Sequence, residues 1–247
     1  MTRRDDELAG FLAAPDRAAY LRANSHLPGP RGNLELLDAA SAAADRAELE
    51  RWAALDAAAA PGDSPDGFLA CVGVVGLGRL VAAGDRSLLP RLRRTANDER
   101  WRVREAVAIG LQAWGDVDPG ALLDEMERWA TGTPLEGRAA MAALCEPRLL
   151  RGRAFVARVL AVLGRLTVMV RDARDPRSDD MRVLRQALGY GWSVAVAADA
   201  EIGLPVLDPW LDDPQPDVRW IVRQNLAKAR LSRVASEWVA RARARVG

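Results

Sequence analysis

Histidine, cysteine and lysine are nearly missing from this chain of 247 residues. Because His26 is the only histidine, catalysis by a serine–histidine or cysteine–histidine pair would depend on one side chain in a Pro- and Gly-rich segment. The sequence has no Cys-x-x-Cys pair and no histidine cluster, so we expect neither a metal site nor another cofactor. Cys71 and Cys145 both lie in apolar, alanine-rich surroundings, which predicts buried free thiols rather than a disulfide.

Long hydrophobic runs and strand-like alternation are also absent. The longest apolar run, Phe68–Leu77, is too short to span a bilayer and contains two glycines. The N-terminal segment lacks the apolar core of a signal peptide, so we expect a soluble cytoplasmic protein with no membrane partner. Valine and isoleucine rarely alternate with polar residues, which predicts an all-α protein. The 49% of apolar residues are enough for a sizeable core.

Positive charge comes almost entirely from arginine, since Lys228 is the only lysine. The 35 basic and 34 acidic residues give a net charge of +1, which argues against a uniformly basic nucleic-acid binder. The charge is uneven, and residues 219–247 carry eight basic and one acidic side chain. The favoured interpretation is the solvated side of an amphipathic helix, because helices near a C-terminus often carry arginine. The alternative is part of a binding surface.

One pattern occurs twice, 115 residues apart. Residues 98–111 read Asp-Glu-Arg-Trp-Arg-Val-Arg-Glu-Ala-Val-Ala-Ile-Gly-Leu, and residues 213–226 read Asp-Pro-Gln-Pro-Asp-Val-Arg-Trp-Ile-Val-Arg-Gln-Asn-Leu. In both, Asp is followed by Val five positions later, Arg six later and Leu thirteen later. The Asp can cap a helix, and the apolar residues recur at the spacing of one buried helix face.

This pattern resembles the HEAT repeat, whose inner helix opens with Asp and then has Val-Arg at this distance. Arg138 lies 34 residues after Arg104, and Arg182 or Arg185 lies between Arg138 and Arg219. These spacings suit a two-helix repeat. The register of the unit that contains Arg182 and Arg185 stays open.

The resemblance implies a right-handed α-solenoid of the ARM type, with about five or six HEAT-like hairpins. Residues 1–65 show a weak repeat signal and are expected to form a degenerate or capping helical region. Residues 66–247 are expected to form the repeat solenoid. We expect Arg104 and Arg219 to reach an Asp of the same or a neighbouring repeat, in a ladder of Asp–Arg contacts. Removing either arginine should then cost about 1–3 kcal/mol.

Apolar periodicity and turn residues divide the chain into helices. The segment 66–83 is apolar nearly all round, so it should be central. Its glycines suit close helix packing better than a phosphate loop, because no Gly-Lys-Ser/Thr signature follows. The expected helices cover residues 4–13, 15–23, 34–44, 46–59, 66–83, 86–96, 98–114, 118–130, 134–145, 152–174, 178–198, 201–212, 215–230 and 234–245.

Binding is the function that the pattern favours. In a helical solenoid the second helix of each hairpin lines the concave side. Arginine flanks tryptophan at positions 101 and 220, which is typical of a cation–π or stacking surface. The alternative is that tryptophan fills gaps between alanine-rich helices. We expect a binding or scaffold protein that holds an acidic or extended protein or peptide in its groove. The groove-binding candidates are Trp101, Arg104, Arg138, Arg185, Tyr190, Trp192, Arg219 and Arg223.

A second, weaker resemblance is to the alkylpurine DNA glycosylases built of HEAT-like repeats, which carry Trp and Asp four residues apart on an inner helix. Trp101 and Glu105 resemble that pair, with Glu in place of Asp. Arg138 would be the Arg of the next repeat, and Tyr190 or Trp192 the later aromatic. The resemblance implies a DNA partner and a carboxylate that stabilises an oxocarbenium-like sugar as the cationic base leaves.

A rival placement of the same motif uses Trp114 and Asp118, with Arg153 and Trp192. The catalytic candidates of a glycosylase-like repair protein are therefore Glu105 and Asp118. A third possibility is a small-molecule enzyme that uses a pocket in the solenoid groove, since a fold does not determine function. Whether the protein is an enzyme stays open.

Overall fold

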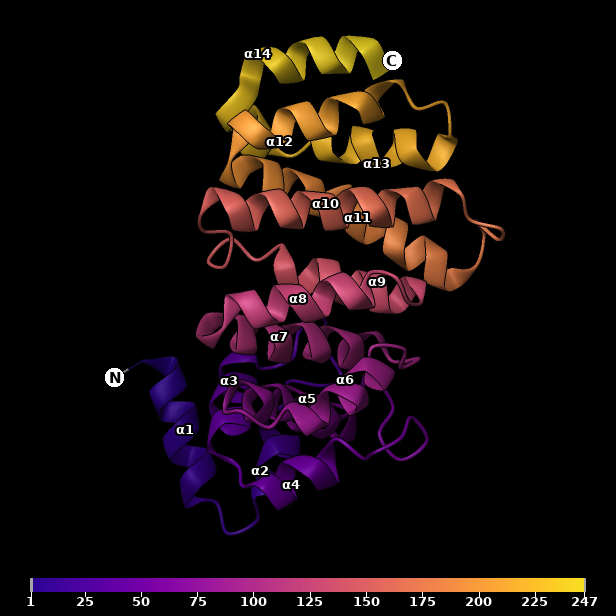
Figure 1. The fold of residues 1–247 in the computed structure, drawn as a ribbon. Coiled ribbons are helices and arrows are strands. Elements are labelled where there is room, and N and C mark those ends of the chain that lie inside the picture. The colour runs from indigo at the N-terminus through magenta and orange to yellow at the C-terminus, as the bar shows by residue number, and fades with distance from the viewer. Residues whose placement is uncertain (1, 247) are drawn as a thin grey trace. The chain divides into compact units, whose positions relative to one another are not determined.

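The computed structural model describes residues 2–246, which form fourteen α-helices, two short 3-10 helices and no strands (Figure 1). The all-α prediction is confirmed. The chain divides into two compact units, Met1–Val117 and Asp118–Gly247. The boundary expected after residue 65 falls inside the first unit, because α5 (Pro65–Ala82) packs against α2, α3 and α4 as well as against α7.

The first unit is built around α5, in which every residue from Gly67 to Gly78 is buried. Among the described residues, α5 is the one helix long and apolar enough to cross a membrane, and 72% of it is buried inside the structure, as in a core helix. The other elements of the first unit are α1 (Arg3–Ala13), α2 (Arg17–Asn24), α3 (Leu34–Ala43), α4 (Arg46–Trp52), η1 (Arg86–Leu88), α6 (Leu89–Thr95) and α7 (Trp101–Val117).

Helices α5 and α7 touch through glycine. A Cβ atom built on Gly78 would lie 2.4 Å from the Cα atom of Gly110, and one built on Gly110 would lie 3.2 Å from the Cα atom of Gly78. The two backbones are therefore in direct contact, which a side chain at either position would prevent. The prediction that glycines in this segment permit close helix packing is confirmed.

In the second unit α11 is central and contacts α9, α10, α12, α13 and α14. Buried polar groups join these helices. Trp192 of α11 donates from Nε1 to Oγ1 of Thr167 on α10 at 3.0 Å, and Asn225 of α13 accepts from the backbone N–H of Ser193 at 2.8 Å. The helices are α8 (Pro119–Trp129), α9 (Pro134–Leu144), α10 (Arg153–Arg171), α11 (Asp179–Ala198), α12 (Ala200–Leu207), η2 (Asp208–Asp212), α13 (Pro216–Leu226) and α14 (Ala229–Val246), which is kinked at Ala235.

Candidate functional site

A pocket of about 320 Å³ opens in the first unit between α3, α5, α7 and the loop that precedes α3. Its volume lies at the lower end of the range for small-molecule sites, and it can also hold one or two large side chains. Its lining is mostly apolar, and the polar groups are few. The lining residues are Leu27, Pro30, Arg31, Gly32, Leu34, Leu37, Phe68, Cys71, Trp101, Arg102, Glu105, Ala106 and Ile109.

The loop of residues 25–33 forms one wall and is held at its base by Asn33. The Asn33 backbone N–H donates to the Ser25 carbonyl at 3.0 Å, and its side-chain amide donates to Glu7 Oε1 at 2.7 Å. The Asn33 side chain also caps α3, because its Oδ1 accepts from the Leu36 N–H at 3.2 Å. Asn33 is only 1% exposed, so this wall is fixed by buried hydrogen bonds.

The opposite wall begins with Trp101, the first residue of α7, whose side chain is 49% exposed. The Arg102 guanidinium lies 4.3 Å from the centroid of the Trp101 ring. Arg102 also donates to Asp63 Oδ1 at 2.9 Å and to the Gly29 carbonyl at 2.8 Å. The cation thus holds one face of the indole by a cation–π contact and joins α7 to two loops. The aromatic ring at the pocket mouth is therefore positioned in advance of any ligand.

Besides Arg102, three ionisable side chains line the pocket, namely those of Glu105, Arg31 and Cys71. Glu105 lies one helical turn after Trp101, on the same side of α7, and both residues line the pocket. Arg31 is exposed, and no described carboxylate pairs with it. Burial raises the pKa of the Cys71 thiol to about 12, so this thiol stays protonated and unreactive at neutral pH. Cys145, in the second unit, is also buried and free, so the prediction for both cysteines is confirmed.

Of the eight groove candidates, Trp101 alone lines this pocket. Arg104 donates to the backbone carbonyls of Asp98 and Glu99 at 2.6 and 2.9 Å. The carboxylate of Asp98 is paired with Arg100 at 2.7 Å. Arg219 donates to the Val246 carbonyl at 2.8 Å. Arg219 thus bonds a carbonyl at the end of α14, where the ladder predicted an Asp. Arg104 bonds two loop carbonyls beside Asp98, and its charge helps to lower the pKa of Asp98, so the expected contact stays a prediction at this position.

A contact of the expected kind occurs elsewhere, between α11 and α13. Arg185 forms an ion pair with Asp217 and lies 4.9 Å from the centroid of the Trp220 ring. Tyr190 is 42% exposed, and the Arg230 guanidinium lies 4.3 Å from its ring centroid.

The three remaining candidates of the second unit differ in burial. Trp192 is fully buried in the core of this unit, so its expected place on a binding surface is wrong. Arg223, on α13, is exposed. Arg138, on α9, is partly buried and takes part in interactions of its own.

The rival catalytic placement falls on residues with structural roles. Asp118 caps α8, and its Oδ1 accepts from the Ala121 N–H at 3.0 Å. Trp114 is 2% exposed, with the Arg86 guanidinium 4.2 Å from its ring centroid. Arg153 pairs with Glu201 at 2.8 Å. Of the two catalytic candidates, Glu105 alone lines the pocket of the first unit.

Among residues 2–246, no group of three or more His, Cys, Asp and Glu side chains is placed to hold a metal ion. Comparison with protein-family models, curated proteins and solved structures finds no match to this chain. The residues of the pocket and the arginines around them are therefore the features of the chain that bear on function.

Proposed function

We propose that this is a soluble, cytoplasmic binding protein, built as a solenoid of HEAT-like repeats, that recognises an acidic peptide segment of a partner protein. A large apolar side chain of the peptide occupies the pocket of the first unit. The observation that carries the proposal is that the apolar lining continues onto two exposed side chains at the pocket mouth. Leu34 is 59% exposed and Trp101 is 49% exposed.

The size of the apolar surface favours a peptide over a small molecule. A molecule that fills about 320 Å³ would occupy the interior of the pocket and leave much of Leu34 and Trp101 in water. A peptide that continues past the pocket would cover both, and covering apolar surface contributes about 25 cal/mol per Å² before the costs of association. Tryptophan and arginine are also the residues most often found at the energetic centre of interfaces.

The acidic character of the peptide follows from Arg31. Its guanidinium is exposed at the pocket, and no described carboxylate neutralises it. A peptide carboxylate can form a bidentate, charge-assisted pair with such a group. Glu105 lies in the same pocket, so the acidic residue of the peptide is expected to lie on the Arg31 side, away from α7.

Repeat character is supported in the second unit by the ion pair between Arg185 and Asp217. These residues belong to two helices, α11 and α13, that pack against each other. Their separation of 32 residues is close to the length of one two-helix repeat. Such a contact between equivalent helices is what stacked HEAT-like hairpins would require.

Leu34→Ser should weaken peptide binding by about tenfold or more without changing stability, because Leu34 is mostly exposed but covers the bound side chain. Trp101→Ala should have the same effect. The probe is an acidic peptide selected by display against the full chain, labelled with fluorescein and followed by anisotropy. Leu12→Ser is the matched control, because Leu12 is 50% exposed on α1 and does not line the pocket. Selection of no peptide, or equal binding by all variants, would contradict the proposal.

A glycosylase-like repair protein is the second candidate, because Trp101 and Glu105 do line one pocket. A labelled DNA duplex, with and without an abasic-site analogue, tests it across a salt series. Micromolar binding with a steep salt dependence, together with loss of alkylated-base release in Glu105→Gln, would support this candidate. No binding at low salt would exclude it and leave the peptide proposal as it stands.

A further inference from the structure

A second pocket lies in the second unit between α13 and α14, with a volume of about 320 Å³. Its floor is apolar and is formed by Leu226, Ala227 and Val246, while Arg223 and Arg243 contribute the charged groups. No acidic residue lines it. Helices α13 and α14 pack against each other, and both belong to the last part of the chain (Figure 1). The proposed peptide site is in the other unit, so the two sites can be tested separately.

Two arginines are held beside this pocket by backbone carbonyls. Arg243 of α14 donates from Nη2 to the Leu226 carbonyl at 2.6 Å, and Arg219 of α13 donates from Nη2 to the Val246 carbonyl at 2.8 Å. Both carbonyls belong to the last turns of their helices, where cations are favoured. Each guanidinium has five N–H groups, so these bonds orient it and leave donors for a ligand.

Arg223 is the residue that helix capping does not explain. It lies one turn after Arg219 and lines the pocket, and the described residues give its guanidinium neither a carboxylate partner nor a carbonyl acceptor. Arg223 and Arg243 therefore line one pocket, and Arg219 is bonded to the carbonyl of Val246, another of its lining residues. Among the described residues no carboxylate pairs with any of these three arginines. Such a group of cations costs electrostatic free energy unless an anion joins it.

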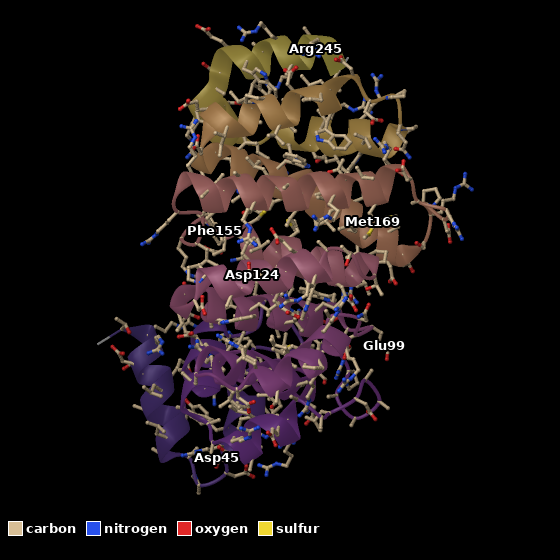
Figure 2. The ribbon with its side chains drawn as sticks, viewed as in Figure 1. Asp45, Glu99, Asp124, Phe155, Met169 and Arg245 are labelled. Atoms are coloured by element: carbon tan, nitrogen blue, oxygen red, sulfur yellow. The ribbon has the colours of Figure 1, made fainter. Side chains whose placement is uncertain are left out.

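The surroundings offer little negative charge. Residues 219–247 contain eight basic residues, and Glu237 is the only acidic one. Figure 2 labels Arg245 at the end of α14. Arg245 forms ion pairs with Asp208 and Asp212 of η2. For the other basic side chains between residues 219 and 246, no carboxylate partner occurs among the described residues. Elsewhere arginines often have acidic neighbours, as Arg158 has in Glu127 at 2.8 Å.

We infer that the pocket between α13 and α14 binds the phosphate group of an organic phosphate monoester. A monoester phosphate carries nearly two negative charges and three acceptor oxygens, which suits the two guanidinium groups of Arg223 and Arg243 that line the pocket. A carboxylate offers one charge and two oxygens, so it can neutralise only one of the guanidinium groups. The apolar floor formed by Leu226, Ala227 and Val246 would contact the organic group attached to the phosphate.

The test is isothermal titration of the full chain with phenyl phosphate, and with benzoate as the carboxylate of matched apolar ring. Phenyl phosphate should bind saturably and about tenfold more tightly than benzoate. Arg223→Gln should weaken phenyl phosphate binding by about tenfold, because one charge-assisted pair is lost. Arg223 is exposed and makes no internal hydrogen bond, so the variant should fold normally.

Arg241→Gln is the matched control, because Arg241 is exposed on α14 and does not line the pocket. Its affinity for phenyl phosphate should stay that of the parent. Equal losses in the two variants, or no saturation with phenyl phosphate, would overturn the inference. A short oligonucleotide provides another arm, since its phosphates are diesters of single charge. Binding of the oligonucleotide without binding of phenyl phosphate would also overturn the inference of a monoester site. It would indicate a diffuse surface for nucleic acid.

Discussion

Replacing Gly78 by alanine should lower the free energy of unfolding by about 3 kcal/mol. The added Cβ would lie 2.4 Å from both the Cα and the carbonyl carbon of Gly110, and these are backbone atoms of α7. A side chain could rotate away, but here the whole of α7 must move from α5, which weakens packing along the most buried helix of the first unit. Urea denaturation followed by circular dichroism measures the change.

The matched control is Gly164→Ala on α10. Nothing lies within 4 Å of a Cβ atom at this position, and Gly164 is in the middle of a long helix. Alanine should therefore raise the free energy of unfolding by about 0.5–1 kcal/mol, because it favours the helix over the unfolded chain. If Gly78→Ala were also neutral or stabilising, the direct contact of α5 with α7 would be wrong.

Arg100→Ala should lower the free energy of unfolding by about 3–5 kcal/mol. The Arg100 side chain is 7% exposed, pairs with Asp98, and donates to the carbonyls of Asp56 and Ala60 at 3.0 and 2.9 Å. Its removal leaves a partly buried carboxylate and two carbonyls without their donor. Thermal and urea unfolding should both show the loss.

Arg128→Ala is the control for the loss of an arginine. The Arg128 side chain is 64% exposed and pairs with Glu125 on its own helix. Exposed pairs of this kind contribute about 0–1 kcal/mol, so this variant should unfold almost like the parent. Similar losses in Arg100→Ala and Arg128→Ala would contradict the buried role assigned to Arg100.

The ion pair of Arg100 and Asp98 also predicts how the stability of the protein depends on pH in acid. Burial acts to raise the pKa of Asp98, but the hydrogen bonds and charge of Arg100 prevail and the pKa is lowered. A carboxyl group whose pKa is lower in the folded state stabilises the fold above its unfolded pKa, about 4, and this stabilisation is lost as the pH falls through the folded pKa. The free energy of unfolding of Asp98→Asn should therefore depend less on pH in that range.

Much of the helical structure follows from the sequence, because the apolar period and the turn residues are local signals. The segment expected at 98–114 is α7, Trp101–Val117, and the segment expected at 118–130 is α8, Pro119–Trp129. The helix expected at 46–59 ends at Trp52 instead. The carbonyls of the following segment bond Arg100, 40 or more residues away, and no local pattern reports such a partner.

Helix caps show the same limit. Asp213 was expected to cap the helix of the second repeat motif, but Gln215 caps α13 and accepts from the N–H groups of Asp217 and Val218. Asp213 instead accepts from the N–H of Gln215 at 2.9 Å, just before α13 begins. Both residues can cap, so the choice depends on where Pro216 lets the helix begin.

The candidate site was predicted in part. Trp101 and Glu105 stood out because they lie one turn apart on a helix that begins with arginine-flanked tryptophan. Arg31 and Leu34 were missed, since they belong to a loop and a helix start that become a wall only through tertiary contacts of Asn33. Trp192 was misplaced because α11 is surrounded by other helices, so its aromatic residues are not confined to one exposed face.

Each unit also contains one buried cysteine. Cys71 is in the first unit and Cys145 is in the second, and burial raises the pKa of each thiol to about 12. Cys71 lines the pocket of the first unit, so a thiol reagent can approach it there, but such a reagent can react with Cys145 only after the surrounding helices separate. The modification rate of Cys145 thus reports the opening of the second unit, and that of Cys71 reports access to the pocket of the first unit, without adding a label or changing a residue.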